Sequence, residues 1–365
     1  MSKNIALQVI SAIVFAVVYC IYSASSIVAC GDLFNTVLGI NKSVAMVTAT
    51  VVIVVYTFLG GFNAVCWTDF FQGMIMLAAL LIAPLFALAL AKAGDGAATG
   101  AALPDGFFNF FTTPQDIISG LGWGLGYFGM PHIIIRFMSL KSEKELRKSS
   151  VIGISWTTII LIMSAMTAIA GRLYLGDIED SSTVFITMVR RIFPALVSGL
   201  LLSAILSAAM STADSQLLAA SSAFASDVYK PVIRKKASGS EMLWAGRIVV
   251  IVIAVVALMI ASDPNSGSIM GLVENAWGVF GAAFGPVILL SLFWKRLTFG
   301  GTVAGIAVGA AVDILWLVFL SSTDIYEIVP GFAAGLLAAV VVSLLSEGPG
   351  KDVEDLFDRS VDLKS

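Results

Sequence analysis

The chain has 365 residues, of which 58% are hydrophobic and only 12% are charged, and its formal net charge at pH 7 is −3. Since an ordinary soluble domain is about half apolar and about a quarter charged, this composition, with its mean hydropathy of +0.97, excludes a soluble globular protein and predicts an integral membrane protein. The small net charge and the short basic loops give no reason to expect nucleic acid as a partner.

Ten apolar stretches are each long enough, at about 20 residues, to cross a bilayer as a helix. In chain order they cover approximately residues 5–29, 45–63, 69–93, 115–138, 150–175, 196–225, 241–262, 268–293, 301–321 and 329–346. Their hydrophobicity is continuous and lacks the period-2 alternation of outer-membrane strands, so we expect helices rather than a barrel. The sequence therefore predicts an all-α transmembrane domain over residues 1–346 and a cytoplasmic tail over residues 347–365.

The distribution of lysine and arginine predicts how these helices are oriented. Cytoplasmic loops retain positive charge, and most of it lies in the connections after the fourth, sixth and eighth stretches, which are on the same side. Their basic residues are Lys141, Lys144, Arg147, Lys148, Lys230, Arg234, Lys235, Lys236, Lys295 and Arg296. We therefore expect a multi-pass protein of the plasma or inner membrane of the cell, with both ends of this chain in the cytoplasm.

The fourth stretch carries an unusual density of glycine. Five glycines lie from Gly120 to Gly129, and Pro131 follows. Interior glycine costs about 1 kcal/mol relative to alanine and proline about 3 kcal/mol, which favours a broken helix whose backbone lines a cavity. Trp123 and Tyr127, four residues apart, would project together and offer a small organic substrate an apolar wall with polar tips. The alternative is close helix packing through small residues, with the aromatic rings in the core.

The sixth stretch has a polar block in its middle. An ionised Asp214 at a helix centre in lipid would cost on the order of 2.5 to 3.5 kcal/mol, so it should face protein or a wet cavity. One helical face holds the positions i, i+3, i+4 and i+7, which are Ala208, Ser211, Thr212 and Ser215. Two hydroxyls beside a backbone carbonyl freed by a helix irregularity would suit a small hard cation. The pattern therefore predicts a sodium site here.

Several longer motifs occur in the same order as in a known family. They cover residues 56–72 (YTFLGGFNAVCWTDFFQ), 122–132 (GWGLGYFGMPH), 210–212 (MST), 216–218 (QLL), 272–286 (LVENAWGVFGAAFGP) and 326–332 (YEIVPGF). Through these motifs the chain resembles the sodium/solute symporter family, and within it the proline-transporting branch. The resemblance extends over nearly the whole chain.

The resemblance implies an all-α, LeuT-like fold of two inverted five-helix repeats that binds sodium and substrate near the membrane midplane. It implies sodium-coupled uptake of proline by alternating access, with sodium as the coupling ion and no other cofactor. In the family further helices precede the stretch that begins here near Ile5, so the resemblance also implies that this chain is N-terminally incomplete.

The resemblance also assigns residues to two groups. The first would bind sodium through the carbonyl of Ala208 and the hydroxyls of Ser211 and Thr212, with Asp69 in the sodium pathway. The second would contact the substrate and comprises Tyr22, Trp123, Tyr127 and Pro131. From here on we name these the sodium group and the substrate group.

For individual polar residues, other interpretations stay open. Asp69 stands three residues before Gln72, as in a capping box, so it is equally suited to begin a helix. The only histidine, His132, is expected to make a structural hydrogen bond. Glu274 and Asp313 lie inside predicted spans; pairing with polar neighbours is one possibility, but the sequence identifies neither their partners nor their roles.

Alternatives also stay open for the function. Met130 stands where the proline branch usually has glutamine, so another small amino acid or a carboxylate is the alternative substrate. A non-transporting fragment and a membrane sensor module with symporter-like helices are the alternative functions. An enzyme is not expected, because no nucleophile–base pair or closed metal constellation stands out. The three cysteines form no CxxC pair, which gives no support for a zinc site or a disulfide framework.

Overall fold

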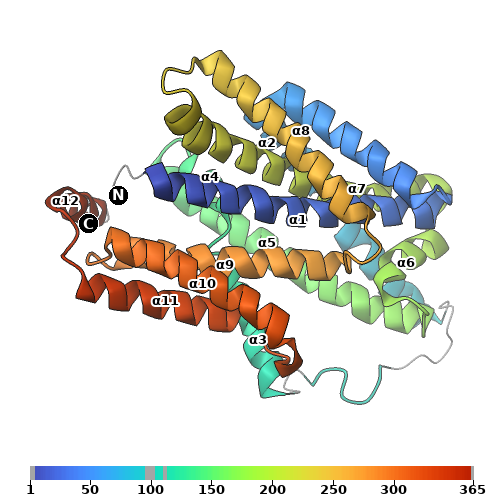
Figure 1. Cartoon of the computed structure of the whole chain (residues 1–365). Helices are drawn as coiled ribbons and strands as arrows, with labels where there is room; N and C mark the ends of the chain where they lie inside the picture. Colours follow the sequence, from blue (N-terminus) through green and yellow to red (C-terminus); the bar gives the residue numbers. More distant parts are fainter. Residues whose placement is uncertain (1–4, 95–102, 110–112, 363–365) are drawn as a thin grey trace. The chain divides into compact units, whose positions relative to one another are not determined.

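The computed structural model describes residues 5–94, 103–109 and 113–362, and this part of the chain is helical and contains no β-strand (Figure 1). The helices are α1 (Ile5–Leu38), α2 (Lys42–Ala93), α3 (Pro114–Gly126), α4 (Pro131–Met138), α5 (Glu143–Leu175), α6 (Val184–Ile192), α7 (Ala195–Ala223), α8 (Gly239–Ser262), α9 (Ile269–Phe293), α10 (Phe299–Phe319), α11 (Ile328–Leu345) and α12 (Lys351–Asp362). Short 3-10 or π-helical segments are η1 (Ser181–Thr183), η2 (Phe224–Ile233) and η3 (Ser321–Thr323). The expectation of an all-α protein is confirmed.

Eight helices within the described residues are long and apolar enough to cross a membrane, whereas the sequence predicts ten spans. One difference is α2, whose 52 residues cover both the second and the third predicted spans. The backbone of α2 is interrupted at Gly61, where φ is 61° and ψ is −164°, a conformation that glycine adopts without a steric penalty. At about 1.5 Å per residue α2 is roughly two and a half times as long as the bilayer core is thick, which is long enough for two spans.

The other difference is the fourth predicted span, which consists of two short helices, α3 and α4. The chain leaves the helix after Gly126 and re-enters it at Pro131. The predicted helix break is therefore confirmed. The helices α6 and α12 lie outside all ten predicted stretches.

Polar side chains at the helix starts explain where several helices begin. The Asn41 side chain accepts hydrogen bonds from the first amides of α2, and Thr113 does the same for α3. Ser238 and Glu241 form a reciprocal capping box at the start of α8, and Thr298 caps α10. These side chains satisfy backbone N–H groups that have no partner within the helix.

The described chain forms two compact units. One unit comprises residues 26–109 and 139–218, and we name it the α2–α7 unit; the other comprises residues 1–25, 110–138 and 219–365, and we name it the α9–α11 unit. The helices α1 and α7 each contribute a part to both units. The sodium group falls in the α2–α7 unit and the substrate group in the α9–α11 unit.

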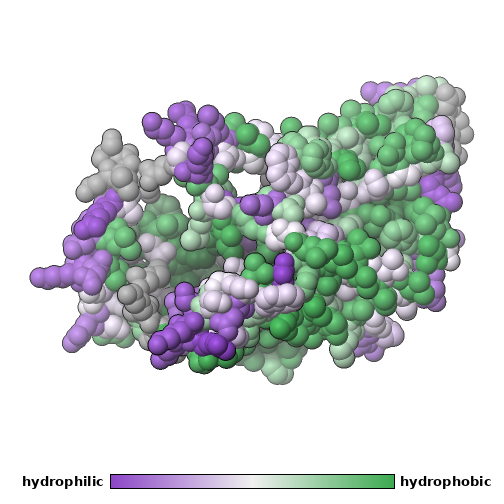
Figure 2. Space-filling model, turned by 90° about the horizontal axis from the view of Figure 1, so that it is seen from above, coloured by the Kyte–Doolittle hydropathy of each residue, from purple (hydrophilic) through white to green (hydrophobic). Residues whose placement is uncertain are grey.

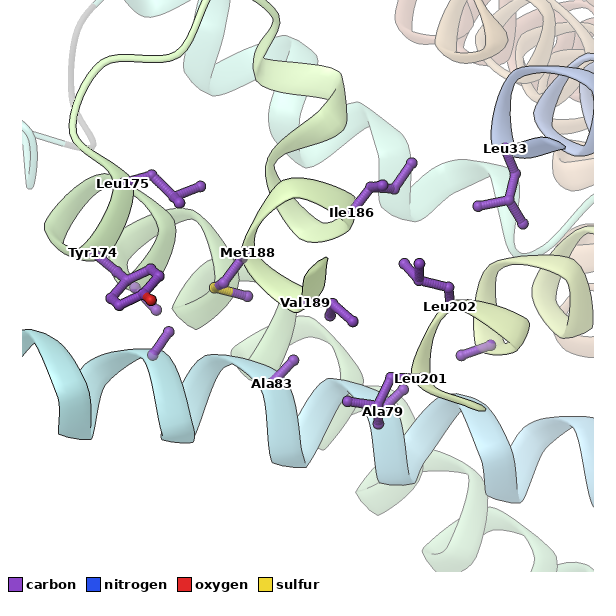
Figure 3. Packing of buried hydrophobic residues seen from close by; sticks show 13 residues of the cluster. Leu33, Ala79, Ala83, Tyr174, Leu175, Ile186, Met188, Val189, Leu201 and Leu202 are labelled. Carbon is purple, nitrogen blue, oxygen red and sulfur yellow. The ribbon is translucent and has the colours of Figure 1, made fainter. Parts of the chain in front are cut away.

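The α2–α7 unit has an apolar core. Met188 and Val189 of α6 and Leu201 of α7 gather against Ala79 and Ala83 of α2 (Figure 3). All five side chains are buried. The alanines repeat every four residues, so they form one small-residue face of α2 on which larger side chains pack closely.

In the α9–α11 unit the three helices α9, α10 and α11 lie side by side (Figure 1). Glycines bring them close together: a Cβ atom on Gly335 of α11 would lie 3.0 Å from the carbonyl oxygens of Ala282 on α9 and Gly305 on α10. The helix α3 packs against α9 and α11. Close approach through small residues is the usual packing mode of membrane helices.

Large apolar side chains lie on the surface of the protein. Leu59, Leu196 and Phe319 are more than two-thirds exposed, and hydrophobic residues cover wide areas of the face in Figure 2. Soluble monomers rarely expose apolar surface on this scale. Together with the eight long apolar helices among the described residues, this surface indicates a multi-pass membrane protein.

Candidate functional site

Three oxygen atoms of the sodium group converge on one turn of α7. The Ser211 hydroxyl donates to the carbonyl of Ala208 at 3.2 Å, and the Thr212 hydroxyl donates to the same carbonyl at 2.8 Å. All three residues are half-buried. Each of these oxygens keeps lone pairs after the hydrogen bonds are made, so the cluster can still bind a small hard cation.

The expectation that a helix irregularity frees the Ala208 carbonyl is wrong. The helix α7 is regular from Ala195 to Ala223, and the irregular backbone begins only at Phe224, where the π-helical segment η2 starts. The three oxygens meet because hydroxyls at i+3 and i+4 reach back to the carbonyl of residue i, a geometry that an intact helix allows.

Asp214 is fully buried and faces protein, as the cost of a carboxylate in lipid predicts. The Tyr56 hydroxyl, from α2, donates to Asp214 Oδ2 at 2.7 Å and lies 3.2 Å from the carbonyl of Met210. The Ser215 hydroxyl oxygen lies 3.3 Å from Asp214 Oδ1. The carboxylate is thus held between α2 and α7, two residues beyond Thr212.

Asp69 joins the same polar contact between α2 and α7. Its Oδ2 atom accepts a hydrogen bond from the Ser215 hydroxyl at 3.2 Å. The capping-box interpretation of Asp69 and Gln72 is wrong, because both residues lie in the interior of α2 rather than at a helix start. Ser215 therefore connects two carboxylates, those of Asp69 and Asp214.

The polar residues at the contact between α2 and α7 indicate which kind of ion this unit can bind. Its polar residues supply carboxylate, hydroxyl and carbonyl oxygens, the ligand types that hard cations prefer. Among the described residues, no group of three or more histidine, cysteine, aspartate or glutamate side chains could hold a metal ion. Oxygen ligands of these kinds suit a hard cation such as sodium better than a soft metal ion.

The substrate group is built around aromatic rings in the α9–α11 unit. The Trp277 indole N–H, from α9, donates to the carbonyl of Trp123 at 3.0 Å. The ring of Trp123 lies 5.2 Å from that of Tyr326, and the ring of Tyr127 lies edge-on to Trp277 at 4.9 Å. Such ring pairs stabilise a rigid aromatic surface.

The glycines of α3 and of the break that follows it divide between the two interpretations that the sequence leaves open, close packing and a broken helix. A Cβ atom on Gly126 would overlap the Trp277 ring, and one on Gly129 would overlap the backbone of Phe280. These two glycines therefore allow close packing against α9. Gly120 and Gly124 have open space around them, so packing does not explain them.

Tyr22 and Pro131 lie near the helix break between α3 and α4. Tyr22, on α1, is buried, and its ring lies 6.2 Å from the ring of His132. Pro131 is buried and begins α4. The Tyr19 hydroxyl accepts a hydrogen bond from the His132 backbone N–H at 3.0 Å and lies 3.2 Å from its Nδ1 atom. The expected structural hydrogen bond of His132 is confirmed.

Several residues of these contacts have no assigned role in the sequence interpretation. The motifs that carry the family resemblance contain Tyr56, Trp277 and Tyr326. Their position in these motifs was the sequence signal that could have pointed to a role. Their partners lie on other helices, as far as 158 residues away for Tyr56 and Asp214. No periodicity within one helix reveals such a partner.

Comparison with known proteins agrees with this architecture. The family model described as "Sodium:solute symporter family" matches residues 2–309. The high-affinity proline transporter PutP of Bacillus subtilis (strain 168) is 43% identical over 98% of this chain and 77% of its own length. A sodium/proline symporter of Haemophilus influenzae is 41% identical over 98% of this chain and 75% of its own length. The osmoregulated proline transporter OpuE of Bacillus subtilis (strain 168) is 40% identical over 96% of this chain and 73% of its own length.

A solved structure shows the same fold at lower sequence identity. It is a Na⁺-coupled sialic acid symporter in a substrate-bound, outward-open state, with a TM-score of 0.76 and 20% identity, and the match covers 95% of this chain and 76% of that one. The expected LeuT-like, all-α fold is confirmed by this similarity. The family and the relatives are transporters, which confirms the expectation of a transporter rather than an enzyme. The chain belongs to the sodium:solute symporter family.

Proposed function

We propose that this chain takes up proline together with sodium across the cell membrane by alternating access. The observation that carries the proposal is the convergence of the Ser211 and Thr212 hydroxyls on the Ala208 carbonyl, in a chain whose relatives are named proline transporters. In this proposal Ala208, Ser211 and Thr212 bind the coupling ion, and Asp69 lies on the path of sodium to them.

The mechanism is thermodynamic coupling. Sodium and substrate stabilise the same one of the two alternating states, and this shared preference is a coupling free energy. Each sodium ion that enters down a membrane potential of 100 mV contributes about 2.3 kcal/mol. The free energy of sodium entry then drives substrate accumulation.

The substrate group fits a small amphipathic molecule. The rings of Trp123 and Tyr127, with Tyr22 and Pro131, offer apolar surface to a pyrrolidine ring, and the tyrosine hydroxyls are polar tips for its charged groups. Another small amino acid or a carboxylate is the alternative substrate.

The proposal includes the topology. Residues 1–346 form the transmembrane symporter domain and residues 347–365 form a cytoplasmic tail. The basic residues concentrate in the connections α4–α5, η2–α8 and α9–α10 and in the helix ends beside them. These connections and both ends of the chain therefore lie on the cytoplasmic side of the plasma or inner membrane.

Uptake by the purified chain in proteoliposomes tests the sodium group. Labelled proline should accumulate under an inward sodium gradient and not under an equal potassium gradient. Ser211→Ala and Thr212→Ala should each raise the sodium concentration for half-maximal uptake. The matched control is Ser203→Ala on the same helix, whose hydroxyl makes the same kind of bond to the Leu200 carbonyl at 2.7 Å. An unchanged sodium dependence in both variants would contradict the assignment.

Competition experiments test the substrate. Unlabelled proline should inhibit uptake of labelled proline far better than alanine or glucose does. Inhibition by alanine or by a small carboxylate at lower concentrations than by proline would identify the alternative substrate class. Equal inhibition by proline, alanine and glucose would remove the assignment to proline.

A further inference from the structure

Two acidic side chains, Asp313 and Glu327, meet in the interior of the α9–α11 unit. Asp313 lies on α10 and is fully buried, and Glu327 stands just before α11 and is 7% exposed. A Cβ atom on Gly278 of α9 would lie 3.0 Å from Asp313 Oδ1 and 3.3 Å from Glu327 Oε1. The two carboxyl groups therefore border the same point next to α9.

The packing around Asp313 leaves room for its side chain and little more. A Cβ atom on Gly331 of α11 would lie 2.9 Å from the Asp313 Cβ atom. Glycines on both neighbouring helices, Gly278 and Gly331, thus allow the carboxyl group to enter between α9 and α11. A bulkier residue at either glycine would collide with it.

Three of the four carboxyl oxygens of this pair have no hydrogen-bond partner among the described residues. Both oxygens of Asp313 and the Oε1 atom of Glu327 are buried without a partner among the described residues. A buried carboxylate without compensation is strongly destabilising, and two of them side by side repel each other. A positive charge or a proton must therefore neutralise the pair.

The described helices that surround the pair, α9, α10 and α11, supply no basic side chain for this purpose. The sequences of α9, α10 and α11 contain no lysine, arginine or histidine. Lys295 and Arg296 precede α10 and lie roughly 25 Å from Asp313 along the helix direction, at about 1.5 Å per residue. Lys295 donates to Asp358, and Arg296 donates to the carbonyl of Ser346.

The other titratable neighbours do not compensate the charge either. Glu274 of α9 is itself an acid, and the Tyr326 hydroxyl donates to the Glu274 backbone carbonyl at 2.8 Å. The helix α3 has one titratable residue, Asp116, at its first turn. Burial raises the pKa of the Glu327 carboxyl above its usual range; a hydrogen bond from its own backbone N–H partly offsets this rise, and the neighbouring Glu274 adds to it.

We propose that Asp313 and Glu327 form a proton-binding site, in which the pair carries at least one proton at neutral pH. A proton needs no additional space and turns the two like charges into a coupled acid pair. A sodium ion would need several more oxygen ligands than the pair offers. The site shares no residue with the sodium group or the substrate group.

Tyr326 connects the proton site with the substrate group. It is adjacent to Glu327 in the sequence, and its ring lies 5.2 Å from that of Trp123. Release of the proton would change the charge next to this ring and so lower the affinity for substrate at alkaline pH. This consequence rests on the proposed function, whereas the proton site itself does not.

Infrared spectroscopy of the purified full chain tests the site without any transport measurement. At pH 7 the wild type should show the C=O stretching band of a protonated carboxyl group. The spectrum of at least one of the single variants Asp313→Asn and Glu327→Gln should lose band intensity equivalent to one carboxyl group. Asn and Gln keep the size of the side chains, so these variants should fold. The matched control, Glu347→Gln, changes an exposed acid and should leave the band unchanged.

The outcomes distinguish a bound proton from a bound sodium ion. Spectra of Asp313→Asn and Glu327→Gln that both equal the wild-type spectrum would overturn the proposal, because both acids would then be ionised. The spectra are also recorded in sodium chloride and in choline chloride at equal ionic strength. A band that depends on Asp313 or Glu327 and disappears only in sodium would assign the site to sodium and overturn the proton site. A band that depends on Asp313 or Glu327 and is the same in both salts supports the proton site.

A melting curve gives a second measurement. Because the folded pair holds a proton that the unfolded chain releases, wild-type stability should fall as the pH rises through the raised pKa of Glu327. Asp313→Asn should weaken this pH dependence, and Glu347→Gln should not. An equal pH dependence in wild type and Asp313→Asn would contradict the assignment of the proton to this pair.

Discussion

Replacing Tyr56 by phenylalanine removes one hydroxyl from the polar contact between α2 and α7. In the wild type this hydroxyl donates to Asp214 Oδ2 at 2.7 Å and lies 3.2 Å from the carbonyl of Met210. Asp214 is fully buried, so water does not readily replace the lost donor. The ring itself and its packing remain. The change therefore isolates the hydrogen bond to Asp214.

The size of the effect follows from the charge of the acceptor. Loss of a hydrogen bond to a charged group costs about 1.5–3 kcal/mol, whereas loss of one between neutral groups costs about 1 kcal/mol. For a unit of this size, each kcal/mol lowers the melting temperature by about 2–4 °C. Tyr56→Phe should therefore lower the melting temperature by roughly 3–12 °C if Asp214 is ionised, and by less if it is neutral.

Thermal unfolding of the purified protein in detergent measures this shift. Tyr174→Phe is the matched control, since Tyr174 is buried in the apolar core of the α2–α7 unit (Figure 3) and its hydroxyl makes no hydrogen bond to another described residue. The control should change the melting temperature little. If Tyr56→Phe is no more destabilising than Tyr174→Phe, the bond to Asp214 does not stabilise the contact, and the reasoning fails.

Three further changes test the two groups and the C-terminal helix. Trp123→Ala should raise the KM for substrate about ten-fold, or about 1.4 kcal/mol, because it removes the ring that packs on Tyr326; initial uptake rates should show an unchanged sodium dependence. Asp69→Asn keeps the side-chain size but removes the charge, and it should raise the sodium concentration for half-maximal uptake by roughly ten-fold. The hydrogen bond from Lys295 to Asp358 at 2.6 Å raises the pKa of Lys295. The contribution of this hydrogen bond to the docking of α12 is therefore complete below the pKa of lysine in the unfolded chain, about 10.4. It is lost as the pH rises through the raised pKa of Lys295 in the folded protein. Because an exposed ion pair contributes little, Lys295→Ala should raise the rate of limited proteolysis of α12 only slightly at pH 7, and the wild-type rate should stay the same from pH 7 to 9.

Matched variants control for general damage. Leu121→Ala changes a residue that is 74% exposed on the same helix as Trp123, so it should leave the KM unchanged. Asp32→Asn removes an acid whose ion pair with Lys42 lies at the surface, and it should leave the sodium dependence unchanged. A shift of the sodium dependence by Trp123→Ala would mean that the two groups are wrongly divided. Equal effects of Asp69→Asn and Asp32→Asn would remove Asp69 from the sodium pathway.

Local sequence features predicted the fold class and one helix break correctly. In lipid every backbone polar group needs an internal partner, so a continuous apolar stretch can only be a helix. This constraint acts on each stretch separately and needs no knowledge of its neighbours. The same holds for the break between Gly126 and Pro131, where glycine and proline weaken the helix locally.

The sequence predictions were wrong at places where a helix continues although the local sequence predicts that it ends or is irregular. Residues 64–68 look like a connection between two spans, but they are helical within α2, and the interruption is at Gly61. As a result Asp69 lies inside a helix and contacts Ser215 instead of capping the start of a helix. For the same reason α7 stays regular at Ala208. Helix boundaries depend on packing against other helices, which a single stretch does not encode.

The sequence by itself therefore determined the class of protein, the approximate spans, the family motifs and the face of α7 that gathers two hydroxyls and a carbonyl. All of these follow from composition or from spacing within one helix. Only the tertiary structure decided which acids meet which partners. Tyr56 and Asp214 are 158 residues apart in the sequence, and Asp313 and Glu327 lie on different elements that glycines of α9 and α11 allow to approach. Whether a buried carboxyl group is bonded, paired or protonated depends on atoms from other helices, and these come together only when the chain is folded.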